Sequence, residues 1–128
     1  MHHTNLILNV EDNDAARHAK TRVLMNAGFR VEEASNGMDA LAMVADLLPS
    51  LVLLDVKLPD ISGSEVCRRI KADPVTRDVF VLQTSAALVS PNDKLLGLQS
   101  GADSYIAAPF EPNELVSKVR SILFQPPC

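Results

Sequence analysis

The chain has 128 residues, of which 47% are hydrophobic and 22% charged, and its formal net charge is −4. This length and composition fit one globular domain with a full core, and an acidic chain without a basic stripe is not expected to bind nucleic acid directly. No apolar run is long enough for a membrane span or a signal peptide, and two cysteines, Cys67 and Cys128, form no disulfide framework. We therefore expect a cytoplasmic protein without membrane contact.

The first part of the chain alternates between short apolar runs and helical patterns. Residues 6–10 predict a strand, and Gly28 ends the helix that follows. The predicted apolar face of this helix recurs at helical spacing: Ala16, Ala19, Val23 and Ala27. Residues 30–34 predict a more polar strand. A second helix follows the turn at Asn36-Gly37 and ends before Pro49, with its apolar face at Leu41, Val44, Ala45 and Leu48.

The middle of the chain contains its most apolar strand, residues 51–55, which ends in Asp55. Four apolar residues in a row predict a strand that is buried on both faces. Ser62 and Glu65 have the spacing of a capping box, so a helix is expected to begin there, with Val66 and Ile70 facing the core. Residues 79–82 predict a fourth strand.

The last part predicts two more helices around a short strand. Ser90 and Pro91 are typical of a helix start, Gly101 ends that helix, and residues 104–106 form the fifth strand. The final helix begins near Glu111, with an apolar face at Leu115, Val119 and Ile122. Because the prolines at 126 and 127 cannot extend a helix, we expect a domain over residues 1–125 and the start of a linker or tail at 126–128.

Five strands that alternate with five helices predict an α/β fold: a flavodoxin-like (βα)5 doubly wound parallel sheet. The apolar strands 6–10, 51–55 and 79–82 suit the middle of the sheet, and the polar strand 30–34 and the short strand 104–106 suit its edges. The strand order 2-1-3-4-5 satisfies this arrangement. In such sheets ligands bind outside the carboxyl ends of the strands, at the switch point between the first and third strands.

Three carboxylates are expected at that switch point. Glu11 and Asp12 follow the first strand, and Asp55 ends the third. Each has a plain structural interpretation, since Asp55 can cap a loop and the acidic stretch around Asn13 can cap a helix. Together they would repel one another unless a cation or protons neutralise them, and oxygen ligands favour a hard cation such as Mg²⁺. Ser85, after the fourth strand, is suited to donate a hydrogen bond to a phosphoryl oxygen.

The sequence resembles the receiver domain of two-component response regulators over residues 6–123. The resemblance rests on an ordered set of motifs, which comprises Val10-Glu-Asp-Asn13, the block at 53–60, Gly63, Ser85-Ala86, residues 101–105 and Pro109-Phe110. The ordered set is far more specific than any one of its members.

The resemblance implies that Asp55 accepts a phosphoryl group from a histidine kinase or a phosphotransfer protein. Mg²⁺ would be held by Glu11, Asp12, Asp55 and the main-chain carbonyl of Lys57. Such a domain is a phosphoacceptor and not an enzyme in itself, although it also occurs as part of hybrid histidine kinases.

The resemblance also implies a switch, in which Ser85 and Tyr105 reorient on phosphorylation. The surface of the fourth helix, fifth strand and fifth helix then changes, and it is the surface through which a homodimer is expected. The Ala108–Pro109 peptide bond is expected to be cis.

One position departs from the family pattern, because Ala108 stands where the family has a lysine. Lys57 is expected to point away from the site and Lys94 to belong to the fourth helix, so neither replaces it readily. Because of this departure, the alternative function is that of a degenerate receiver, which acts as a phosphorylation-independent protein-interaction module.

Two further classes of protein share this topology. A flavin or nucleotide binder needs a phosphate-binding loop after the first strand, where this chain has the acidic residues 11–14. A phosphatase with an aspartyl nucleophile usually has a second carboxylate two residues later, where this chain has Lys57.

Overall fold

The computed structural model describes residues 6–85 and 101–124. Five strands form one sheet in the order β2-β1-β3-β4-β5, and all neighbouring strands are parallel. Their bounds are β1 Leu6–Val10, β2 Arg30–Ala34, β3 Leu51–Asp55, β4 Phe80–Ser85 and β5 Ser104–Ala107. The doubly wound fold and the strand order expected from the sequence are therefore confirmed.

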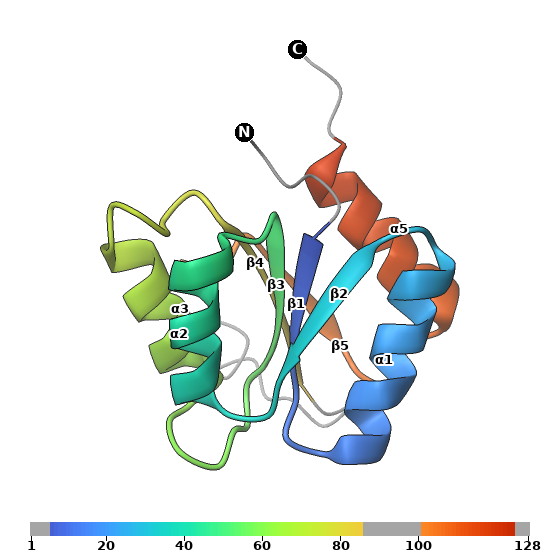
Figure 1. The fold of residues 1–128 in the computed structure, drawn as a ribbon. Coiled ribbons are helices and arrows are strands. Elements are labelled where there is room, and N and C mark those ends of the chain that lie inside the picture. The colour runs from blue at the N-terminus through green and yellow to red at the C-terminus, as the bar shows by residue number, and fades with distance from the viewer. Residues whose placement is uncertain (1–5, 86–100, 125–128) are drawn as a thin grey trace.

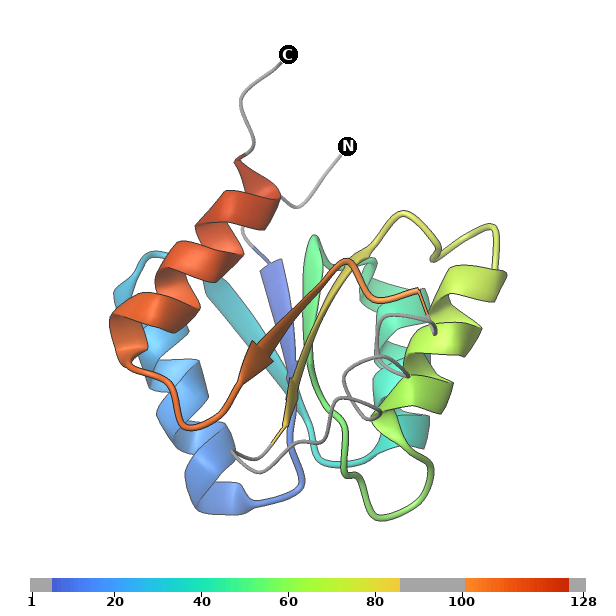
Figure 2. The same ribbon diagram turned by 180° about the vertical axis from the view of Figure 1, so that it is seen from behind.

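Helices cover both faces of the sheet. They are α1 Asp14–Asn26, α2 Gly37–Leu47, α3 Gly63–Ala72 and α5 Pro112–Leu123. Figures 1 and 2 show α2 and α3 on one face of the sheet and α1 and α5 on the other. The helix expected to begin at Ser90 lies outside the described residues, so the described part of the chain has four of the five expected helices.

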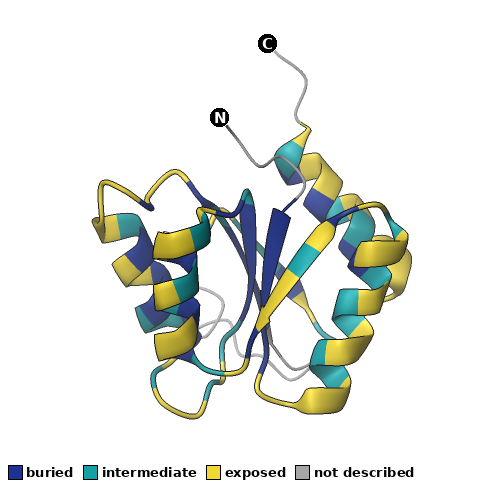
Figure 3. Cartoon of the chain, in the orientation of Figure 1, coloured by how far each residue is buried: buried dark blue, intermediate teal, exposed yellow. Residues whose placement is uncertain are grey.

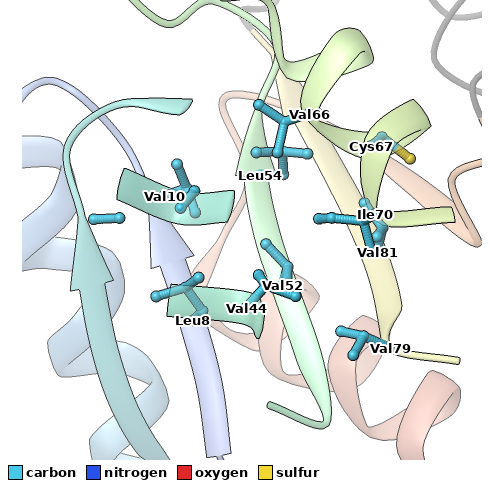
Figure 4. Close-up of a cluster of buried hydrophobic side chains, with 12 residues drawn as sticks. Leu8, Val10, Val44, Val52, Leu54, Val66, Cys67, Ile70, Val79 and Val81 are labelled. Carbon is cyan, nitrogen blue, oxygen red and sulfur yellow. The ribbon is translucent and has the colours of Figure 1, made fainter. Parts of the chain in front are cut away.

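The core lies on both sides of the three central strands. Alternate residues of β3 face opposite ways, so Val52 and Leu54 join the cluster under α2 and α3, whereas Leu51 and Leu53 join the cluster under α1 and α5. Figure 4 shows the first cluster, in which Val66 and Ile70 of α3 point towards the strands. All residues of β1 are buried and most of β2 is exposed, as the central and edge positions require (Figure 3).

Strand β4 is longer than the sequence pattern predicted. It continues from the predicted end at Leu82 to Ser85. The polar residues Gln83 and Thr84 remain in the strand because main-chain pairing with β3 and β5 does not depend on side-chain polarity. The extension brings the end of β4 level with Asp55, which pairs with Thr84.

The face of α1 that packs on the sheet differs from the predicted one. Ala19 is exposed, and Leu24, which was not predicted to face inward, is completely buried. Arg17 and Lys20 are partly buried on this face. Small alanines on several sides of a helix give a weak periodicity, so the sequence pattern did not fix the rotation of the helix. Gly28 has a φ of 100° and follows the helix, as predicted.

No helix within residues 6–85 and 101–124 is long and apolar enough to cross a membrane.

Candidate functional site

The loop after β1 places two carboxylates at the carboxyl edge of the sheet. The main-chain N–H of Glu11 donates to the carbonyl of Ala34 at 3.0 Å, which keeps Glu11 in line with the sheet. The Asn13 side chain caps α1 by accepting the N–H of Ala16 at 2.8 Å. Because Asn13 satisfies the helix start, Asp12 is not needed as the cap, and its side chain is exposed.

Asp55 ends β3 next to this loop. The register pairs Val10 of β1 with Leu54 of β3, so the residues that follow, Glu11 and Asp55, lie side by side. Figure 1 shows that the β1–α1 loop and the β3–α3 loop leave the same edge of the sheet. The main-chain N–H of Lys57 lies 3.3 Å from Asp55 Oδ1 and orients that oxygen.

Glu11, Asp12 and Asp55 form a three-carboxylate cluster. One oxygen from each lies within 4.8 Å of the others. Glu11 and Asp12 come from the loop after β1 and Asp55 from the end of β3, segments that are far apart in sequence, and the adjacency of β1 and β3 brings them together. The structure thus places the three residues at one edge, as the sequence predicted.

The charges in this cluster perturb one another. Burial, followed by the negative charge of Glu11, raises the pKa of Asp55 to about 6. Burial also acts to raise the pKa of Glu11, but hydrogen bonds from the Lys20 ammonium and the Asn13 amide outweigh it, so the pKa of Glu11 is lowered. At neutral pH the ionised carboxylates of Asp55 and Glu11 therefore repel each other.

The donor set of this cluster fits a hard divalent cation. Carboxylate oxygens that converge within one ion's reach, with one exposed member to admit the ion and its waters, are what Mg²⁺ requires. No sulfur or imidazole ligand belongs to the cluster, which disfavours zinc and copper.

Lys20 also belongs to this edge, and sequence reasoning missed it. Its Nζ donates to Glu11 Oε1 at 2.9 Å, and its side chain is 14% exposed. The signal in the sequence is its spacing: Lys20 lies one turn from Leu24, the buried residue of α1, and one turn from the partly buried Arg17. A charged residue on the inward face of a helix, near the carboxyl edge of the sheet, indicates a partner there.

The β3–α3 loop is held against α2 by Asp60. Its carboxylate accepts the main-chain N–H groups of Gly37 and Met38, both at 2.8 Å. These bonds at the start of a helix lower the pKa of Asp60 to about 2. The Gly63 N–H donates to the carbonyl of Val56 at 2.8 Å, which folds the loop back beneath Asp55.

The predicted switch residues lie on two neighbouring strands, β4 and β5. Ser85 ends β4 and pairs with Ala107, while Tyr105 is partly buried in β5. The expected contact of the Ser85 hydroxyl, and the predicted positions of Ala86 and Lys94, lie outside what the structure describes. The Ala108–Pro109 bond is cis, as expected, and Lys57 is exposed.

Comparison with known proteins identifies the family. The family model for the response regulator receiver domain matches residues 7–120. The phosphate regulon transcriptional regulatory protein PhoB of Pseudomonas aeruginosa is 40% identical over 117 residues, which cover 91% of this chain and 51% of that protein. The chain thus spans about half the length of this relative.

Solved structures give the same result. The crystal structure of a response regulator from Chloroflexus aurantiacus matches with a TM-score of 0.88 and 36% identity, over 93% of this chain and 97% of that one. The receiver domain of the sensor histidine kinase PA1611 from Pseudomonas aeruginosa matches with a TM-score of 0.86 and 28% identity, again over 93% and 97%. That structure has a magnesium ion coordinated in its active-site cleft.

The chain therefore belongs to the response regulator receiver domains, the phosphoacceptor modules of two-component signal transduction.

Proposed function

We propose that Asp55 is the phosphoacceptor and that it takes a phosphoryl group from a phosphohistidine of a histidine kinase or a phosphotransfer protein. The observation that carries this proposal is a partly buried carboxylate at the end of a central strand, within 4.8 Å of two further carboxylates. An intact acidic cluster argues against the alternative of a phosphorylation-independent interaction module, which has no use for three carboxylates that repel one another.

In the transfer, one carboxylate oxygen of Asp55 attacks phosphorus, and the phosphorus–nitrogen bond to the donor imidazole breaks. The electron pair returns to the ring nitrogen. Because the other ring nitrogen of the donor carries a proton, an acyl phosphate and a neutral histidine result. The Lys57 N–H, 3.3 Å from Oδ1, orients the carboxylate and leaves its other oxygen to attack. The pKa of Asp55, raised to about 6, still allows the nucleophile to be ionised at neutral pH.

Mg²⁺ is the proposed cofactor, held by Glu11, Asp12, Asp55 and the main-chain carbonyl of Lys57. When bound, such an ion neutralises the carboxylates and the charge on the transferring group. The partly buried Glu11 is held in place by Lys20 and Asn13, whereas the exposed Asp12 is free of the helix cap and suited to ligate directly.

We propose further that Ser85 and Tyr105 report phosphorylation to the surface around β5 and α5. Tyr105, Glu114 and Lys118 line an open groove between these two elements. This groove is the described part of the surface through which we expect a homodimer; the rest, from residues 86–100, lies outside the described residues. Sedimentation with and without beryllofluoride, a phosphoryl mimic, tests that expectation.

The proposed domain covers residues 1–125 in the cytoplasm, with a linker or tail beginning at 126. The chain spans about half the length of its curated relatives. The output of the whole protein therefore depends on any further domain that is joined to this one. A hybrid histidine kinase and a stand-alone regulator are both compatible with such a domain.

Mass spectrometry after incubation with Mg²⁺ and phosphoramidate tests the assignment of Asp55. The intact mass is expected to rise by about 80 Da, the mass of one phosphoryl group. Asp55→Asn should abolish the rise, and Asp46→Asn, on the exposed side of α2, is the matched control that should leave it unchanged. A phosphorylated Asp55→Asn variant would refute the assignment.

A further inference from the structure

Lys20 reaches the acidic cluster from the inward face of α1. Its Nζ lies 2.9 Å from Glu11 Oε1, and the two side chains are 14% and 9% exposed. An ion pair so little exposed is screened less by solvent than a surface pair, and it holds both side chains in one place. Lys20 is therefore an integral part of this edge and not a solvated lysine that happens to be close.

The other basic residue on this face of α1 is engaged elsewhere. Arg17 donates to the main-chain carbonyl of Glu11 at 2.9 Å and to the Asp14 carboxylate at 2.6 Å, and it lies 3.9 Å from Glu33. Among the described residues, Lys20 is the one lysine or arginine whose ion pair involves a carboxylate of the cluster.

A metal ion at the cluster would meet a Glu11 carboxylate whose two oxygens both already accept hydrogen bonds. Glu11 has two oxygens: Oε2 accepts the N–H of Asn13 at 3.1 Å, and Oε1 accepts Lys20. A cation that approaches Asp12 and Asp55 therefore meets a Glu11 carboxylate that already has a positive charge beside it. Two cations at one carboxylate repel each other, and the ammonium must move or share its oxygen.

We propose that Lys20 is a built-in counter-ion of the metal site, a positioning residue that competes with the divalent cation for Glu11. The proposal deepens the function proposed above and rests on the metal site that it includes. In the metal-free domain Lys20 reduces the repulsion among the three carboxylates and leaves the cluster with two net negative charges. One divalent cation then brings the site to neutrality before a negatively charged phosphoryl group arrives.

Calorimetric titration of the metal-free domain with Mg²⁺ tests this role. Lys20→Met removes the competing charge and nearly keeps the length of the side chain. Mg²⁺ should then bind at least about tenfold more tightly, because even at the dielectric constant of water the removal of one charge near a divalent ion has an effect of this size, and this site is less exposed than that. Lys20→Arg keeps the charge and should bind Mg²⁺ like the wild type. Arg22→Met removes the same charge from an exposed position of the same helix and is the matched control.

A second variant covers the case in which Lys20→Met does not fold. Lys20→Gln retains a hydrogen-bond donor for Glu11 but not the charge, and it too should bind Mg²⁺ more tightly than the wild type. The rise in melting temperature on adding Mg²⁺ should likewise be larger in both neutral variants than in the wild type and in Arg22→Met. Unchanged or weaker Mg²⁺ binding in folded neutral variants overturns the proposal.

The outcomes for the counter-ion and for the phosphoacceptor are distinguishable. Tighter Mg²⁺ binding in Lys20→Met, together with an Asp55 that phosphoramidate does not modify, supports the counter-ion and removes the proposed function. Phosphorylation of Asp55 in a domain whose Mg²⁺ affinity does not depend on Lys20 supports the phosphoacceptor and overturns the counter-ion.

Discussion

Gly63 packs its Cα directly against the carbonyl oxygen of Asp55. A Cβ at this position would lie well inside van der Waals contact of that oxygen and would also collide with the Cα of Val56. Both obstacles are main chain at the end of a central strand, which cannot move aside without disturbing the sheet. The residue that begins α3 is therefore in contact with the backbone of the proposed nucleophile.

Gly63→Ala is expected to be destabilising and to weaken the metal site at the same time. Overpacking in a well-packed region typically costs about 1–3 kcal/mol, and a rigid main-chain obstacle favours the upper part of this range. Denaturant unfolding measures the loss, and a Mg²⁺ titration measures the displacement of Asp55. Ser64→Ala, at the next position of α3, is the control. Wild-type stability in Gly63→Ala would show that the loop has room to shift.

The raised pKa of Asp55 predicts a pH dependence of stability in metal-free protein. Because folding raises the pKa from 3.8 to about 6, the protonated form is favoured in the folded state, and this contribution is lost as the pH rises from about 4 through 6. Relative to Asp55→Asn, the wild type should lose at most about 3 kcal/mol over that window.

Urea unfolding at several pH values, with a chelator present, measures this difference. Comparison with Asp55→Asn removes the contributions of the other carboxylates, including Glu11, whose pKa is shifted in the opposite direction. Added Mg²⁺ should abolish the effect, because the cation stabilises the ionised carboxylate. Carboxylates and histidine titrate between roughly pH 4 and 8. A difference in unfolding free energy between the two proteins that stays constant over this range would contradict the prediction.

Asp12→Ala should separate stability from metal binding. Removing one of three mutually repelling carboxylates should stabilise the metal-free domain by a few tenths of a kcal/mol, because Asp12 is exposed and its repulsion is screened. Mg²⁺ affinity should fall by more than about tenfold, since even indirect partners of a metal matter on that scale.

Thermal unfolding and calorimetry measure the two effects of Asp12→Ala separately. Asp14→Ala is a suitable control for metal affinity, because Asp14 carries the same charge two residues away but pairs with Arg17 at 2.6 Å. Unchanged Mg²⁺ affinity in Asp12→Ala would exclude Asp12 as a ligand.

Ala108→Lys should strengthen the response to phosphorylation. A lysine at this position can supply a charge-assisted hydrogen bond to the phosphoryl group, worth roughly 1.5–3 kcal/mol. Its absence should weaken the preference for the active arrangement by about one to two orders of magnitude, at about 1.4 kcal/mol for each factor of ten. NMR shifts of Ser85 and Tyr105, with and without beryllofluoride, measure the response. A full switch in the wild type that Ala108→Lys does not extend would mean that another group replaces the lysine.

Much of the fold and part of the site follow from the sequence alone. The uninterrupted apolar run at 51–54 must be buried on both faces, which in a parallel sheet requires a layer of helices on each side. Asp55 then lies where that run ends. The alternation of strands and helices predicts parallel strands, which bring Glu11 and Asp12 to the same edge as Asp55. Glycine and proline positions mark most of the helix boundaries.

Other features depend on tertiary contacts that have no local signature. The rotation of α1 about its axis determines that Lys20 meets Glu11, and this rotation is set by the packing of Leu24 and not by the weak alanine pattern. The extension of β4 through Gln83 and Thr84 comes from main-chain pairing with two neighbours, which side-chain polarity does not reveal. The raised pKa of Asp55 arises from burial and from Glu11, a residue far away in sequence, so the electrostatics of the site exist only once β1 and β3 lie side by side.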